Sequence, residues 1–377
     1  MERFRRVAVS IKKKKIEYID GIKGVACMMV MLGHYYCIYS LAEEFIPMPA
    51  LLEGVFRLVE FFLDADLGLF IFALLSGYCV ALSKIDTVKK LLGAIFKRFI
   101  RFLIPVLGAN VITYLIYLSI GFHNGATTEL FVNMWFWSYY QNDMWLGLAV
   151  KDSVKTILGN GAVFNASFWV IRYFFYASMI VYVGSYLESK CTDKIKYVLY
   201  VLELVAATYL FQTNGFAIAL GAVWCKIERT DLLSRWNNKK VLGVLAAVAF
   251  VLLDGGAEWL AALLGINVIT TAWAKILYAF IILYAISRVE ILTRLFSKKV
   301  FVDLSKLSFG IYALHWPIIC SISSLLFLQV EFSVGAYLLI GAGTAGLVLV
   351  AALLYHLTVE KCCDVVLKVV NERVLNG

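Results

Sequence analysis

The sequence predicts an all-α protein: a polytopic membrane helix bundle of about ten transmembrane helices, with both termini cytoplasmic. Of the 377 residues, 62% are hydrophobic and only 16% are charged, whereas a soluble domain averages about 45–50% apolar and about 25% charged residues. Several long stretches carry no charged side chain, as a spanning helix of about 20 residues requires. The basic residues, which give a net charge of +9, lie in short clusters between these stretches. This pattern sets membrane orientation and argues against a soluble globule and against nucleic acid as a partner.

Ten predominantly apolar stretches are read as spans, some of them shorter than the ~20 residues of a full spanning helix. They are residues 22–41, 67–83, 102–121, 167–187, 196–212, 214–227, 240–255, 271–287, 307–328 and 333–357. The seventh and eighth have the weakest pattern, because their runs are short and Lys275 interrupts the eighth.

The loop charges give the orientation. Of the 35 lysines and arginines, 30 lie in both termini and in every second loop. The alternate loops hold only Arg57, Lys151 and Lys155. Because positive charge is retained in the cytoplasm, both termini are expected there. We therefore expect a basic cytoplasmic N-terminus over 1–21, a transmembrane domain over 22–357 and a cytoplasmic tail over 358–377.

An ionisable side chain inside a span suggests a function, and His34 lies about twelve residues into the first predicted span. Lys23 precedes it by eleven residues, which places both on one helix face, ~16 Å apart along the axis. A cation at the mouth and an imidazole at mid-membrane suit an anionic substrate that reaches inward. A histidine hydrogen-bonded between packed helices is the alternative.

Two further segments carry polar side chains at span ends. Arg98 and Arg101 are three residues apart and so share a helix face, where they can clamp phosphate or contact lipid headgroups. Residues 308–317 read SFGIYALHWP, which brings Tyr312 and His315 to one face. Pro317 loosens the helix and frees carbonyls that need partners. An interfacial aromatic belt would produce a similar pattern.

Five segments, in order, resemble the acyltransferase-3 family of integral membrane acyltransferases. Residues 18–26, YIDGIKGVA, resemble the family's LDGLRGIA, and His34 stands where the family has the histidine of its R-x10-H motif. Residues 70–78, FIFALLSGY, resemble FFVLSGF. Arg98 and Arg101 match the family's R-x-x-R. Residues 308–317 resemble the family's SYGIYLLHxP, and residues 355–361 resemble its YRLVERP.

The resemblance implies transfer of an acyl group, acetyl above all, from cytosolic acyl-CoA to a hydroxyl of an extracytoplasmic saccharide or glycolipid. His34 would be the general base, and Lys23, Arg98 and Arg101 would bind CoA phosphates. The supporting residues implied by the motifs are Asp20, Ser76, Tyr312, His315 and Glu360. The expected location is the bacterial plasma (inner) membrane, in contact with lipids. A homo-oligomer is compatible with this reading, and no metal is expected.

Two positions depart from the family pattern. Lys23 stands where the family usually has Arg, so the planar guanidinium fork is lost and a point charge remains. Arg172 follows Trp169 in a region where the family commonly has a Glu. The departure near Trp169 leaves open a catalytically inactive membrane sensory module. Ten spans and a histidine at mid-membrane are also compatible with a transporter or flippase using His34 in a proton relay. Direct transfer and a covalent acyl-histidine also remain alternatives.

Overall fold

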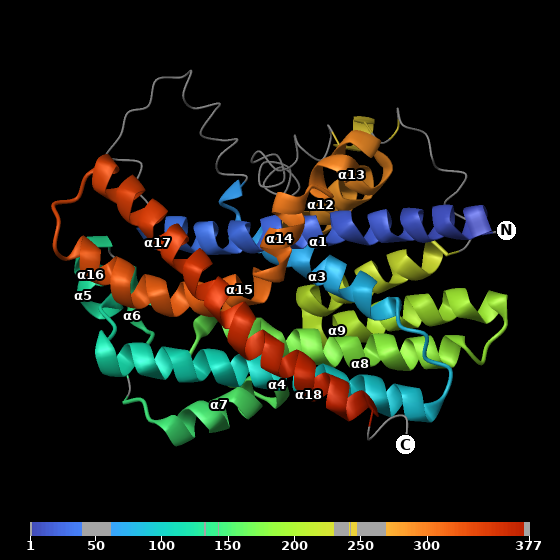
Figure 1. The fold of residues 1–377 in the computed structure, drawn as a ribbon, viewed down its shortest axis with the longest axis horizontal. Coiled ribbons are helices and arrows are strands. Elements are labelled where there is room, and N and C mark those ends of the chain that lie inside the picture. Colours follow the sequence, from blue (N-terminus) through green and yellow to red (C-terminus); the bar gives the residue numbers. More distant parts are fainter. Residues whose placement is uncertain are drawn as a thin grey trace. The chain divides into compact units, whose positions relative to one another are not determined.

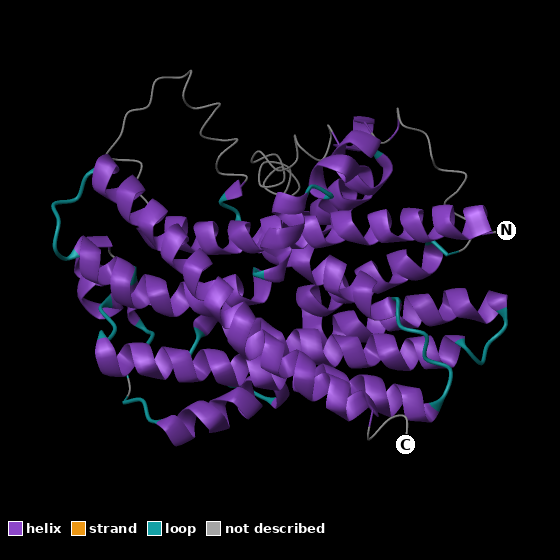
Figure 2. Cartoon of the chain, in the orientation of Figure 1, coloured by secondary structure: helices purple, strands orange, loops and turns teal. Residues whose placement is uncertain are grey.

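The computed structural model describes residues 2–39, 62–131, 133–141, 143–229, 241, 243–246 and 269–372. Within them the chain is all-helical and has no strand, which confirms the predicted fold class (Figures 1 and 2). The chain divides into two compact units. Unit 1 comprises Met1–Cys27, Asp66–Leu91 and Tyr176–Lys306, and unit 2 comprises Met28–Ala65, Leu92–Phe175 and Leu307–Gly377.

Six helical segments of the described residues are long and apolar enough to cross a membrane. They are Glu17–Tyr39, Val88–Ser119, Ala166–Glu188, Lys194–Ile227, Ser308–Phe327 and Val334–Val370. The pair Ala272–Arg288 and Glu290–Phe296, bent by 98°, adds a seventh if it is one span. The protein is thus an integral multi-pass membrane protein. The count of ten and the cytoplasmic termini stay predictions, and the stretch 240–255 lies largely outside the described residues.

The predicted spans 196–212 and 214–227 fall within one element, α9 (Asp193–Ile227), which leaves helical geometry at Gln212 (φ 50°, ψ −137°). Lys226 Nζ nevertheless lies 2.5 Å from Glu203 Oε2, although 23 residues of straight helix would separate them by ~35 Å. The chain therefore folds back at Gln212, and the two predicted stretches are the two arms of a helical hairpin.

Unit 1 packs this hairpin against α3 (Ala65–Ala81). A Cβ on Gly77 would lie 1.8 Å from the carbonyl oxygen of Ile218, and one on Gly221 would lie 1.9 Å from that of Leu74. Both positions therefore require glycine for close helix packing. The other elements assigned to the unit are the first part of α1 (Glu2–Tyr39), most of α8 (Ile171–Glu188), α12 (Ile269–Arg288), α13 (Glu290–Phe296) and α14 (Lys299–Lys306).

Unit 2 contains the last part of α1, most of α4 (Val88–Ser119) and a series of shorter elements. These are α5 (Asn124–Phe131), α6 (Met134–Trp137), α7 (Leu146–Leu158), η2 (Ala166–Val170), α15 (Ser308–Ile318), η5 (Ile319–Ser323), α16 (Ser324–Phe327), α17 (Val334–Tyr355), η6 (His356–Glu360) and α18 (Lys361–Val370).

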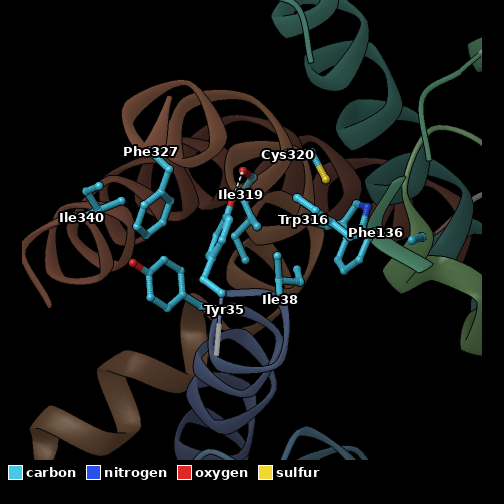
Figure 3. Packing of buried hydrophobic residues seen from close by; sticks show 10 residues of the cluster. Tyr35, Ile38, Phe136, Trp316, Ile319, Cys320, Phe327 and Ile340 are labelled. Carbon is cyan, nitrogen blue, oxygen red and sulfur yellow. Dashed lines mark hydrogen bonds between the residues drawn. The ribbon is translucent and has the colours of Figure 1, made fainter. Parts of the chain in front are cut away.

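A buried aromatic cluster fixes the end of α1 against α15 and η5. It includes Tyr35, Tyr39, Phe136, Trp316 and Phe327, several of which are drawn in Figure 3. The rings of Tyr39 and Phe327 are 4.5 Å apart, in the range favourable for aromatic pairs. The cluster thereby sets the position and rotation of the α1 segment that carries His34.

The helix that follows Pro317 widens into one π-helical turn, η5. Side-chain hydroxyls meet the carbonyls there: Ser321 donates to the carbonyl of Pro317 at 2.6 Å and Ser324 to that of Ile319 at 3.1 Å. Tyr39 also donates to the carbonyl of Ile319, at 3.0 Å. The carbonyl that Pro317 itself leaves without a helical N–H is that of Ala313, four residues earlier, and it accepts from the side-chain amide of the buried Asn165 at 2.5 Å. This bears out the expectation that Pro317 disturbs the helix and that the freed carbonyl finds a polar partner.

Candidate functional site

His34 on α1 and His315 on α15 form the centre of a polar cluster in unit 2. His34 Nδ1 lies 2.9 Å from His315 Nε2, and the two ring planes differ by only 7°. The ring centroids are 5.1 Å apart, about the 2.9 Å between the nitrogens plus one ring radius on either side, so the imidazoles meet edge to edge. The hydrogen bond consequently lies close to the plane of both rings, which is the favoured geometry for a ring nitrogen.

The neighbours of His315 determine which nitrogen of each ring carries a proton. His315 Nδ1 lies 3.0 Å from the carbonyl oxygen of Ile311, which can only accept, so Nδ1 is protonated in the neutral ring. His315 Nε2 is then an acceptor, and His34 Nδ1 donates to it. We assign the neutral His34 as the Nδ1–H tautomer. Its Nε2 therefore keeps a lone pair that can accept a proton.

Ser167, on the short helix η2, is the third member of the cluster. Its Oγ lies 3.2 Å from His315 Nε2 and is a second donor to that nitrogen. The Tyr312 hydroxyl donates to the Ser167 carbonyl. Asn165 is fully buried, accepts from the backbone N–H of Ser167 at 3.1 Å and donates to the carbonyl of Ala313 at 2.5 Å. The start of η2 is thus tied to α15 at Tyr312, Ala313 and His315.

A buried carboxylate holds the chain that leads into η2. Asp152 on α7 accepts the backbone N–H groups of Val163 and Phe164, both at 3.2 Å, and the side-chain amide of Asn110 at 3.4 Å. Burial raises the pKa of Asp152, and these hydrogen bonds act in the opposite direction. α7 therefore positions the segment that presents Asn165 and Ser167.

Aromatic rings surround the half-buried His34. The fully buried Trp316 meets it edge-on, with ring centroids 5.4 Å apart. Trp135 on α6 lies 6.4 Å away and packs against Trp316 at 5.0 Å. These rings lower the local polarity, which favours a neutral imidazole as a proton acceptor.

The predicted phosphate-binding residues fall in both units. Arg98 and Arg101 lie in unit 2 on one continuous helix, α4, as expected, with the Arg98 guanidinium 4.6 Å from the Phe102 ring centroid. Lys23 belongs to unit 1, where its Nζ lies 3.3 Å from Asp20 Oδ1. Binding of CoA phosphates by Lys23, Arg98 and Arg101 stays a prediction, and so does the supporting role of Asp20.

Three other residues are singled out by the sequence, and the partners of two of them, Glu360 and Arg172, bear on their roles. Ser76 is half-buried on α3 in unit 1. Glu360 Oε2 lies 2.5 Å from His356 Nδ1 in unit 2. Arg172, in the region after Trp169 that holds no acid, donates to the Tyr173 hydroxyl at 2.6 Å and stacks over that ring. The supporting roles of Ser76 and Glu360 stay predictions.

Sequence reasoning missed Ser167, Asn165 and Trp135 as neighbours of the histidines. Asn165 and Ser167 belong to an Asn-Ala-Ser tripeptide that runs into the start of the predicted span 167–187. Two polar residues at the boundary of a span are the one feature that could have drawn attention to them. That feature does not predict which residue they contact. Trp135 lies in an aromatic stretch of what reads as a long loop, without any motif around it.

The comparisons with known proteins agree with the motifs. The family model described as an acyltransferase domain, Acyl_transf_3, matches residues 16–356. No curated protein and no solved structure matches the chain. Because the family match covers nearly the whole chain, this multi-pass membrane protein belongs to the acyltransferase-3 family.

Proposed function

We propose that the protein transfers an acyl group, acetyl in the first instance, from acyl-CoA to a hydroxyl of an extracytoplasmic saccharide or glycolipid. The observation that carries the proposal is the chain of hydrogen bonds from Ile311 through His315 to His34. This chain leaves Nε2 of His34 free of a proton and fixes the plane of its ring. A positioned, neutral imidazole is the general base that acyl transfer to a hydroxyl needs.

In the proposed reaction, the acceptor hydroxyl oxygen attacks the thioester carbonyl while His34 Nε2 takes the hydroxyl proton. The new C–O bond forms, the C–S bond breaks, and the departing thiolate takes up a proton from His34. The cycle thus ends with a neutral His34, an ester and free CoA thiol. As His34 becomes an imidazolium, its Nδ1–H bond to His315 becomes charge-assisted and stronger. His315 is therefore a positioning residue that favours the protonated intermediate state.

The donor would be held through its phosphates by Arg98 and Arg101. Two guanidinium groups on one face of α4 have the chemistry for bidentate phosphate contacts. The packing of Arg98 over Phe102 pre-orders its planar group. Acyl-CoA supplies an activated acyl thioester, and the residues of the chain supply binding, orientation and the base.

The proposal is tested by release of free thiol from acetyl-CoA by the purified protein in lipid nanodiscs. Thiol release that requires an added saccharide, with the acetyl group recovered on that saccharide, is the expected result. Movement of a solute without loss of thioester would instead identify a transporter. Absence of both, across acyl-CoA donors and saccharides, would identify a membrane module without transferase activity.

Arg98→Ala is expected to raise the KM for acetyl-CoA about tenfold or more, because it removes charge-assisted hydrogen bonds each worth about 1.5–3 kcal/mol. The kcat at saturating donor should change little. Arg98→Lys should be intermediate, since it keeps the charge and loses the fork. Arg294→Ala, at an exposed arginine paired with Glu290, is the matched control. Steady-state kinetics with varied donor measure the effect, and an unchanged donor KM in Arg98→Ala would refute the phosphate-binding role.

A further inference from the structure

Two tryptophans of the short helix α6 are exposed to the same extent but differ in their position relative to His34. Trp135 and Trp137 are each 45% exposed. The Trp135 ring lies 6.4 Å from the His34 ring, tilted by 32°. Trp137 lies two residues further along the helix, which turns its side chain by about 200° from that of Trp135. Trp135 therefore offers an accessible aromatic surface beside the base, and Trp137 is a matched exposed residue that points elsewhere.

α6 is a rigid support for this ring. Asn133 caps the helix by accepting the backbone N–H of Phe136 at 3.1 Å. The buried Asn124 donates to the carbonyls of Phe136 and Tyr139, both at 2.8 Å. Phe136 itself is buried and packs against Trp316 at 6.1 Å. Because these contacts fix the backbone on both sides of Trp135, little ordering would be needed for a ligand to bind its ring.

Trp135, Trp316 and Tyr139 form an aromatic corner next to His34. The Trp135 ring meets that of Trp316 at 5.0 Å and that of Tyr139 at 5.6 Å, in both cases steeply inclined. Trp316 is fully buried, yet its indole Nε1–H has no hydrogen-bond partner within the part of the chain that the structure describes. A buried donor without a partner is costly, but this N–H is closed to solvent, so the surface that the corner offers to a ligand is that of Trp135.

We propose that this corner is the acceptor subsite and that it binds the pyranose ring of a saccharide, with Trp135 as the stacking platform. The inference rests on the proposed function, which supplies the hydroxyl-bearing acceptor. One face of a pyranose presents C–H groups that pack on an aromatic ring, while its hydroxyls project from the edge. A sugar stacked on Trp135 would hold an edge hydroxyl toward His34, whose ring lies 6.4 Å from the Trp135 ring. Aromatic walls with few polar groups are typical of such small-molecule sites.

The test compares a cyclic with an acyclic acceptor, methyl glucopyranoside and glycerol, in nanodiscs. Isothermal titration calorimetry measures binding of each probe without any thioester chemistry. Trp135→Ala should weaken methyl glucopyranoside binding about tenfold, through loss of the stacking surface. Trp137→Ala should bind like the wild type, and Trp135→Phe should recover most of the affinity. Glycerol, which has no ring, should bind equally weakly to the wild type and to the three variants.

Three results would overturn the subsite: no preference of the wild type for the cyclic probe, equal losses in Trp135→Ala and Trp137→Ala, or no loss in Trp135→Ala. Equal losses would identify both residues as parts of an interfacial aromatic belt. Thiol release from acetyl-CoA is measured on the same samples. Binding of methyl glucopyranoside that depends on Trp135 but never leads to thiol release would support the subsite while refuting the transferase function.

Discussion

His34→Ala is expected to lower kcat for acetyl transfer by about 10²–10⁴-fold, which is the usual contribution of a positioned general base. The physical reason is specific to one atom. His34 Nδ1 is engaged with His315 at 2.9 Å, so Nε2 is the nitrogen that can take the acceptor proton. Thiol release from acetyl-CoA in the presence of a saccharide measures the rate.

His34→Asn is the matched variant, because it separates loss of the base from loss of packing. The amide nitrogen of asparagine occupies about the position of Nδ1 and can still donate to His315 Nε2. It offers no basic atom at the position of Nε2. The His34→Asn and His34→Ala proteins should therefore be similarly inactive, although the asparagine variant should retain more of the wild-type thermal stability. An asparagine variant that transfers acetyl at the wild-type rate would remove His34 from the role of base.

The all-helical class could be predicted from the sequence, and motifs singled out His34 and His315, but the contact between the two histidines could not be predicted. His34 and His315 are 281 positions apart in the chain, and only the packing of α1 against α15 brings them together. Spans that are apolar on nearly every side show no distinct polar face, so periodicity does not give their rotation about the axis. The hairpin of α9 was easier to locate, because Gln212 to Gly215 interrupt an apolar run with turn-forming residues.

The remainder of the site comes from a segment whose local sequence carries little information. Ser167 reaches His315 because Asn165 is bonded to α15 and because Asp152 holds the preceding backbone. Each of these contacts joins separate elements, and none follows from spacing along the chain. Trp135 likewise depends on a turn fixed by Asn124 and Asn133. Short elements between spans are therefore where the structure adds most to the sequence.

His315→Ala is expected to reduce kcat about 100-fold, a loss typical of a misoriented catalytic group, with little change in the KM of either substrate. Without Nε2 of His315, nothing in the described cluster selects the Nδ1–H tautomer of His34 or fixes its ring. The imidazole would then populate the other tautomer, in which Nε2 carries the proton and cannot act as a base. The KM values should be preserved because His315 is fully buried and both of its ring nitrogens are hydrogen-bonded within the protein. It therefore has no polar atom left to bind either substrate.

Two substitutions of His315 distinguish positioning from simple loss of a buried ring. In His315→Gln, the side-chain amide oxygen can lie near the position of Nε2 and accept from His34 Nδ1, so much of the kcat should return. In His315→Asn, the shorter side chain places its polar atoms near the position of Nδ1, where they meet the Ile311 carbonyl rather than His34. Asparagine should therefore be as impaired as alanine. Both variants leave unfilled volume, so a purely structural role would predict that they lose activity in proportion to their loss of thermal stability. Recovery in glutamine alone, with kcat restored at unchanged KM, would show that the hydrogen bond to His34 is what the reaction requires.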